Sequence, residues 1–263
     1  MSVTLPPYRV ALDAARAAGR LIREQFGQAQ AVELKGERDL VTAVDRAAEA
    51  LIVERIRAAF PDHAVLAEEG TGRGRGGATH CWFIDPLDGT TNYAHGYPFC
   101  AVSIAYAVAG IVQVGVVYDP LHEELFTAAA GTGAYLNGQR LRVSTTPRLQ
   151  HSLLISGFPY DRADMPRALR LWTALLPLSQ ALRRDGAAAL DLCYVAAGRA
   201  DGFWERHLQP WDLAAGALIV REAGGQVSDF RGGPLDLHGG EVVATNGRIH
   251  AELVATLRAA EGD

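Results

Sequence analysis

Apolar residues recur at three- and four-residue spacing in two stretches near the start of the chain. This spacing puts them on one face of a helix, and it predicts helices over Tyr8 to Phe26 and Ala48 to Phe60. The apolar positions are Ala11, Ala14, Ala15, Ala18, Leu21, Ile22 and Phe26, then Ala48, Leu51, Ile52, Ile56, Ala59 and Phe60. Thr42-x-x-Asp45 precedes the second stretch and is typical of a capping box.

Short apolar runs between turn residues predict strands in the rest of the first half, at Ala64 to Ala67 and Trp82 to Ile84. The apolar stretch from Phe99 to Val117 is about long enough to cross a membrane. It contains polar residues and has Ala109-Gly110 near its middle, so a buried hairpin is the better prediction. Asn137-Gly138 predicts a second hairpin.

Strand and helix patterns alternate in the second half, which predicts a layered α/β arrangement. The strands are expected at 153–155, 203–205, 226–228 and 242–244, and the helices at 165–176, 187–197, 212–223 and 246–260. No repeat or low-complexity linker divides the chain. We therefore expect one domain over residues 1–263, with sub-halves at about 1–145 and 146–263.

Composition narrows the functional classes. The net charge of −5 and pI of 5.9 disfavour a general nucleic-acid binder, which needs a basic face. The three cysteines lack C-x-x-C spacing, and the first residues lack the basic and apolar blocks of a signal peptide. We expect reduced thiols and a cytoplasmic protein without a membrane segment.

The stretch from Trp82 to Tyr93 holds the most informative residues. The apolar run ends at Asp85, and Pro86 is expected to stop the strand from continuing as a paired one. Asp88-Gly89 predicts a tight turn, and the residues after it can open a helix whose backbone N–H groups would suit a phosphate. Carboxylates repel phosphate, so both features together require cations between them.

The candidate cation ligands are Glu68, Asp85, Asp88 and Asp212, and each has a structural alternative. Glu68 could be the solvated end of a strand, Asp85 and Asp88 could build only a turn, and Asp212 could be a helix N-cap. Asp45 is most simply the capping-box acid. The chain has no P-loop, no EF-hand pattern and no H-x-x-x-H, and all-oxygen ligands favour Mg²⁺ or Mn²⁺.

Five separated segments together resemble the inositol monophosphatase family. Asp85 to Asn92 and Trp211 to Gly216 are similar to its two signatures. Asp39 to Asp45, Ala67 to Glu69 and Gly186 to Leu192 match further family segments in the same order. The likeness covers nearly the whole chain, and five ordered matches are far more specific than one.

The resemblance implies a mixed α/β fold, a layered αβαβα sandwich, which is usually dimeric and hydrolyses phosphate monoesters with Mg²⁺. By position, one ion would be held by Glu68, Asp85 and the Leu87 carbonyl. A second would be held by Asp85, Asp88 and Asp212. A third could be placed through Glu68, and Mn²⁺ could substitute.

The resemblance also implies catalytic roles for Glu68, Thr90 and Asp45. Thr90, hydrogen-bonded towards Asp45, would orient or deprotonate the attacking water. The N–H groups of Gly89 and Thr90 would hold phosphate oxygens. Substrate contacts are further expected at Asp88, Ala188 and Glu205, although Glu205 could be an ordinary strand-end charge. Ala187 departs from the small hydroxyl residue that relatives often carry.

Thr91-Asn92-Tyr93, which follows Asp88-Gly89-Thr90, is similar to the continuation in inositol monophosphatases, so the resemblance favours inositol 1-phosphate as substrate. Fructose 1,6-bisphosphate, histidinol phosphate and 3'-phosphoadenosine 5'-phosphate remain alternatives, and lithium inhibition is expected by likeness. A regulatory partner of the RNA machinery on the same scaffold is a different class of function. Arg183-Arg184 is expected to be a solvated helix end, with an acidic substrate or partner as the alternative.

Overall fold

The computed structural model describes residues 5–28, 32–34, 40–70 and 78–262. Asp39, which belongs to one of the matched family segments, lies outside the described residues. Within them, no helix is long and apolar enough to cross a membrane. The stretch from Phe99 to Val117 forms most of a hairpin, as predicted, with its turn at Ala109-Gly110.

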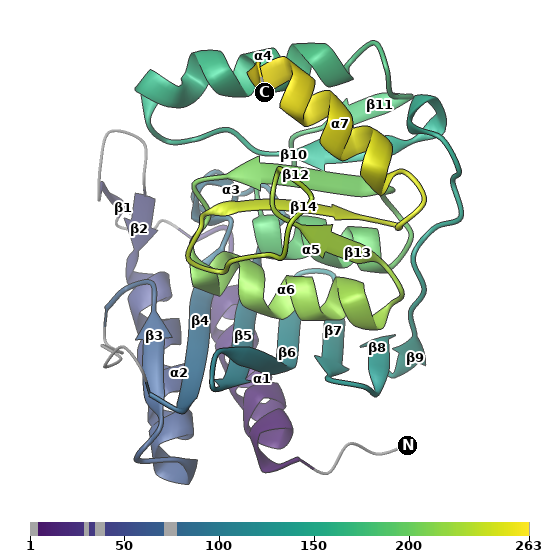
Figure 1. Ribbon diagram of the computed structural model, residues 1–263. Helices are drawn as coiled ribbons and strands as arrows, with labels where there is room; N and C mark the ends of the chain where they lie inside the picture. The colour runs from purple at the N-terminus through teal and green to yellow at the C-terminus, as the bar shows by residue number, and fades with distance from the viewer. Residues whose placement is uncertain (1–4, 29–31, 35–39, 71–77, 263) are drawn as a thin grey trace.

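Two β-sheets and three helix layers alternate through the molecule (Figure 1). The larger sheet has the order β3-β4-β5-β6-β7-β8-β9. Its strands are β3 (Ala64–Ala67), β4 (His80–Asp88), β5 (Ala101–Val108), β6 (Ile111–Asp119), β7 (Glu124–Ala129), β8 (Gly133–Leu136) and β9 (Gln139–Arg140). Only β3 and β4 are parallel, and the other pairs are antiparallel, as consecutive hairpins require.

The second sheet has the order β11-β10-β12-β14-β13 and mixes parallel with antiparallel pairs. Its strands are β10 (Leu153–Ser156), β11 (Ala181–Arg183), β12 (Gly202–Arg206), β13 (Gln226–Ser228) and β14 (Glu241–Thr245). Separately, β1 (Val32–Leu34) pairs with β2 (Leu40–Thr42). The three-residue strand β11 was not predicted, and Arg183 lies in it, so the prediction of a helix end there is wrong.

The helices fill the remaining layers. They are α1 (Pro6–Gln25), α2 (Ala43–Ala59), α3 (Thr90–Ala94), α4 (Met165–Leu175), α5 (Ala188–Ala196), α6 (Pro210–Glu222) and α7 (His250–Glu261). Helices α1 and α2 cover the outer face of the larger sheet, α5 and α6 lie between the sheets, and α4 and α7 cover the smaller sheet (Figure 1). This is the αβαβα sandwich that the resemblance implied.

Each layer boundary has its own hydrophobic core. The outer helices α1 and α2 each bury one apolar face. On α1, the alanines of that face (Ala11, Ala14, Ala15 and Ala18) are fully buried against the sheet. Helices α5 and α6 have sheets on both sides and are apolar almost all round. A third core joins the smaller sheet to α4 and α7. The central position of α5 and α6 follows from this apolar surface.

Strand β6 and helix α6 approach each other at backbone distance. A Cβ added at Gly115 would lie 2.7 Å from the carbonyl oxygen of Ala215 and 3.1 Å from its Cα. No rotamer change can relieve a clash with backbone. Gly115 therefore sets the spacing between the larger sheet and the central helix layer.

Gly115→Ala is expected to lower the free energy of unfolding by about 1–3 kcal/mol, because β6 and α6 must separate to admit the methyl group. Gly202→Ala is the matched control, since the nearest atoms to its Cβ would be side-chain ends, those of Leu154 at 3.0 Å and of Leu253 and Thr245 at 3.4 Å. Urea unfolding of both variants measures the difference. Equal free energies of unfolding for the two variants would show that the close approach of β6 and α6 does not limit what fits at Gly115.

Candidate active site

The end of β4 is bent by a bulge that places two carboxylates. Asp85 is opposite Ser103 on β5, and the register shifts before Asp88 pairs with Ala101. The strand thus continues past Pro86, so the prediction that pairing ends there is wrong. The bulge tolerates Pro86, which has no N–H to donate. Within it, the Asp85 Oδ1 atom accepts a hydrogen bond from the Leu87 N–H at 3.0 Å.

Gly89 turns the chain from β4 into α3 with a φ of +89°. A Cβ there would lie 2.9 Å from the carbonyl oxygen of Phe99, so glycine is required by both conformation and space. Thr90 follows at the first turn of α3 and is buried. The turn and the helix start are those predicted from the sequence.

Thr90 is held from two sides. Its Oγ1 lies 2.8 Å from Asp45 Oδ1 and 3.0 Å from the Leu87 carbonyl oxygen. The other oxygen of Asp45 closes the predicted capping box with Thr42 at the start of α2. Asp45 therefore both caps α2 and contacts Thr90, and the two expectations for this residue are compatible.

These residues border a pocket of about 320 Å³ between the two sheets. Its lining includes Glu68, Asp85, Leu87, Asp88, Gly89, Thr90, Ala188, Glu205 and Asp212. Asp45 lies behind Thr90 and does not line it. The structure thus brings together every candidate site residue predicted from the sequence. They come from α2, the turn after β3, β4, the N-cap and first turn of α3, α5, β12 and α6.

The carboxyl groups in this pocket raise one another's pKa values. Burial, then the charges of Glu68, Asp88 and Asp212, raises the pKa of Asp85 well above its usual 3.8. Burial raises the pKa of Asp88 to about 7, against the lowering effect of the Ala189 N–H. Burial and the charge of Asp88 raise the pKa of Asp212 to about 8. The cluster thus resists full ionisation unless positive charge is supplied.

The donor set fits hard divalent cations. The pocket offers carboxylate oxygens and Leu87, whose carbonyl is a further oxygen donor. His207 also lines it, but its imidazole contacts Asp164. Among the described residues, no three His, Cys, Asp or Glu side chains form a preformed cage for one ion. Instead, the Asp85 carboxyl hydrogen-bonds to those of Glu68 and Asp212. Ionisation of these carboxyl groups would give their oxygens the negative charge that binds a cation.

Asp88 also joins the two halves of the chain. Its Oδ2 accepts a hydrogen bond from the Ala189 N–H at 2.7 Å, in the first turn of α5. The N-cap residue of α5 is Ala187, whose side chain cannot cap. The carboxylate of Asp88 takes over that role. An N–H group at the start of α5 therefore has an acceptor, although Ala187 has no hydroxyl group to offer.

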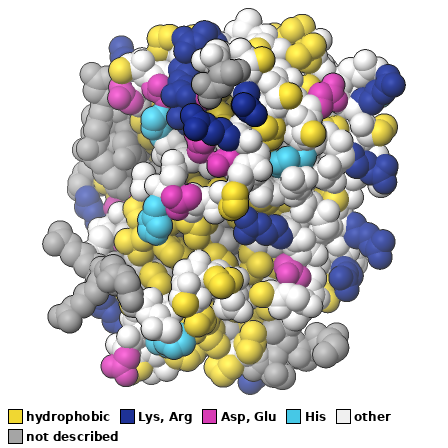
Figure 2. Space-filling view, in the orientation of Figure 1, with side chains coloured by type: hydrophobic (Ala, Val, Ile, Leu, Met, Phe, Trp, Pro, Cys, Tyr) yellow, Lys and Arg dark blue, Asp and Glu magenta, His cyan; other side chains and the backbone are white. Residues whose placement is uncertain are grey.

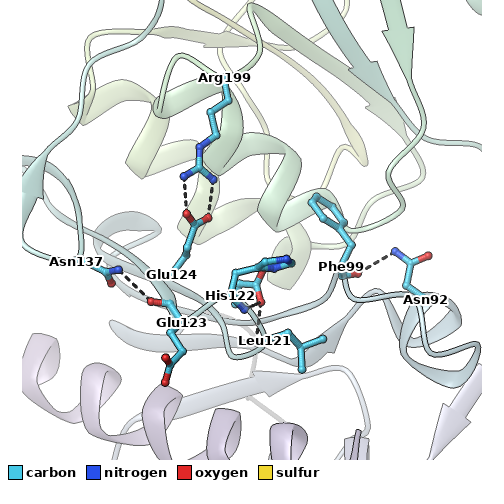
Figure 3. Close-up of polar contacts among 9 residues, drawn as sticks. Asn92, Phe99, Leu121, His122, Glu123, Glu124, Asn137 and Arg199 are labelled. Carbon is cyan, nitrogen blue, oxygen red and sulfur yellow. Dashed lines mark hydrogen bonds and ion pairs between the residues drawn. The ribbon is translucent and has the colours of Figure 1, made fainter. Parts of the chain in front are cut away.

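Asn92 is a second link that sequence reasoning did not single out. Its Nδ2 donates to the carbonyl oxygen of Phe99 at 2.9 Å (Figure 3). It also donates to the carbonyl oxygen of Asp185 at 2.8 Å. The first bond closes the loop after α3, and the second fixes the segment leading into α5. Its place within the first signature was the available signal, but the partner carbonyl of Asp185 lies far away in sequence.

Basic residues form one side of the pocket. Arg206 bonds to Glu241 at 2.9 Å and to Glu261 of α7 at 3.0 Å, and His207 contacts Asp164. Arg184 also lines the pocket, so it lies at the site rather than at a helix end. Figure 2 shows arginine side chains gathered over α4, with acidic side chains below them. The pocket thus pairs an acidic floor with a partly basic rim.

Without metal, the protein is expected to lose stability as pH rises from 6 to 8.5. Asp88 and Asp212 have folded-state pKa values of about 7 and about 8, above the usual 3.8 of an unfolded chain. The folded state therefore binds more protons in this window, and stability present below pH 4 is lost as pH rises through 7–8. Thermal unfolding in EDTA measures this, and Mg²⁺ should offset the decline. A melting temperature that rises across this window would contradict it.

Comparison with known proteins finds relatives that align with nearly the whole chain. It is 50% identical over 252 residues to an inositol-1-monophosphatase of Synechocystis, covering 95% of this chain and 88% of the relative. It is 48% identical over 261 residues to the Nus factor SuhB of Pseudomonas aeruginosa, covering 96% of each.

Solved structures agree with this relation. The extragenic suppressor protein suhB of Bartonella henselae superposes with a TM-score of 0.91 at 42% identity, over 95% of this chain and 97% of that one. An inositol monophosphatase of Anabaena gives 0.87 at 45% identity, over 96% and 95%. The inositol monophosphatase family matches residues 6–262. The chain therefore belongs to the inositol monophosphatase family.

Proposed function

We propose that the protein is a Mg²⁺-dependent phosphatase that hydrolyses inositol 1-phosphate to inositol and phosphate. The observation that carries this proposal is the convergence of four carboxylates beside the start of α3 in one polar pocket. An anionic ester can enter such a pocket only if cations balance the acids. Family membership and the relative named inositol-1-monophosphatase support the substrate class.

Glu68, Asp85 and the Leu87 carbonyl would hold one ion, and Asp85, Asp88 and Asp212 a second, with a third near Glu68. Mn²⁺ could substitute. When bound, the ions lower the pKa of water and neutralise charge on the ester and the leaving oxygen. Because Asp85 lies between Glu68 and Asp212, its two carboxylate oxygens suit a shared ligand.

Thr90 would orient the attacking water. Its hydroxyl donates to the Asp45 carboxylate, which leaves a lone pair of Oγ1 to accept a hydrogen from water in the pocket. The buried Asp45 is fixed by Thr42 and cannot turn away. The chain's role in this step is to hold the nucleophile in line with the phosphorus atom, and no covalent enzyme intermediate is needed.

The N–H groups of Gly89 and Thr90 would hold phosphate oxygens. Both lie at the start of α3, where backbone N–H groups lack partners within the helix. Gly89 and Thr90 line the same pocket as the acids, which supports this role. Phosphate would then lie between these amides and the bound ions.

Ala188 and Glu205 would contact the hydroxyl groups of the inositol ring. Both line the pocket away from α3, on α5 and β12. Burial raises the pKa of Glu205 to about 8, partly offset by Arg184. Glu205 rests against Gly157, where an added Cβ would lie 1.9 Å from its Oε1. The absent side chain at Gly157 is what lets Glu205 reach this position.

Asp88→Asn is expected to lower kcat by about 100-fold or more, because even residues that only support metal ligands are worth about 10–100-fold. Asparagine can still accept the Ala189 N–H, so α5 should remain capped and the fold intact. Phosphate release is measured with inositol 1-phosphate, fructose 1,6-bisphosphate, histidinol phosphate and 3'-phosphoadenosine 5'-phosphate, with and without Mg²⁺, and with lithium. Near-normal turnover by the variant would refute the assignment.

Gly157→Ala is expected to raise KM for inositol 1-phosphate about tenfold, since the methyl group displaces the Glu205 carboxylate and its hydroxyl contacts. Glu205→Gln should likewise raise KM by more than it lowers kcat. Hydrolysis of p-nitrophenyl phosphate, which has no ring hydroxyls, should change little. A uniform loss on both substrates would argue that Glu205 does not contact the polyol.

A second role is favoured by the relatives named Nus factor SuhB, which match over 96% of the chain. By this alternative, the protein is a partner of the transcription machinery on the same scaffold. The four acids, Thr90 and Asp45 favour the enzyme, because a binding scaffold has no need of them, and both roles can coexist. We further propose a cytoplasmic homodimer, as the family likeness implies.

A further inference from the structure

Glu49 is a fully buried carboxylate that lies beside the candidate active site without lining it. It is 0% exposed, on α2 four residues after Asp45, so both acids occupy one face of the helix. Its Oε2 accepts a hydrogen bond from the Glu69 N–H at 2.6 Å. A charged group is costly to bury, and a buried one usually holds something in place.

The segment that Glu49 contacts carries a candidate metal ligand. The Glu68 N–H donates to the Ile84 carbonyl oxygen of β4 at 3.2 Å, and the next N–H, of Glu69, donates to Glu49. These two amides belong to the peptide planes on either side of the Glu68 Cα atom. When both planes are fixed, the φ and ψ of Glu68 are fixed, and so is the direction of its Cα–Cβ bond.

We propose that Glu49 is a positioning residue for the metal site, holding the Glu68–Glu69 turn so that Glu68 is directed towards Asp85. This inference rests on the proposed function. One helix then aligns two parts of the site, because Asp45 in the first turn of α2 fixes Thr90 and Glu49 one turn later fixes Glu68. A shift of α2 would misplace both together.

The test compares Mn²⁺ binding to metal-free full-length protein by calorimetry, with thermal unfolding and Mg²⁺-dependent activity measured alongside. Glu49→Ala is expected to weaken Mn²⁺ binding about 10-fold or more and to raise the half-saturating Mg²⁺ concentration similarly, with KM unchanged at saturating Mg²⁺. Glu49→Gln keeps an oxygen acceptor and should stay within about threefold of wild type. Glu54→Ala, an exposed acid on the same helix, is the matched control.

Glu49→Asp decides the question if the alanine variant does not fold. It keeps the charge but is one methylene too short for the 2.6 Å contact, so it should weaken Mn²⁺ binding as alanine does. A folded Glu49→Ala or Glu49→Asp variant that binds Mn²⁺ like wild type would overturn the positioning role while leaving the phosphatase proposal intact. Wild-type protein that binds Mn²⁺ but releases no phosphate would instead refute the proposed function. The comparison of Mn²⁺ binding between wild type and the Glu49 variants would still test the positioning role.

Discussion

The repulsion among four carboxyl groups in one partly buried pocket is the constraint on which the rest of the structure depends. Glu68, Asp85, Asp88 and Asp212 are brought close enough that charge on one raises the pKa of another. Such an arrangement is unfavourable in itself. A fold that keeps it needs both a source of opposite charge and a rigid frame around the acids.

The frame consists of contacts between segments distant in sequence. Asp88 caps α5 through the Ala189 N–H, and Asn92 binds carbonyls on both sides of the same junction. On the other side, α2 holds Thr90 and the turn after Glu68 through two buried acids. The Asp88 and Asn92 contacts join the two halves of the chain, whereas the two contacts of α2 lie within the first half.

The layered architecture explains why these supports meet at one place. Helices α5 and α6 are buried between the sheets, and their N-terminal turns carry Ala188 and Asp212 to the same pocket as the end of β4. Gly115 allows α6 to lie directly against the larger sheet, and Gly157 leaves room for Glu205. Two missing side chains thus set the approach of α6 to the larger sheet and the place of Glu205 in the pocket.

The sequence by itself determined most of the elements. Helical spacing predicted α1 and α2, the capping box at Thr42 marked the start of α2, and Asn137-Gly138 marked a hairpin, because these signals act between near neighbours. The candidate acids were found only through residue types and family resemblance. Only the tertiary structure decided that Pro86 lies within a bulged strand, that Arg184 lines the pocket, and that Glu49 supports Glu68's turn. Each depends on contacts between segments that are separated along the chain, and sequence distance does not reveal which of them meet in space.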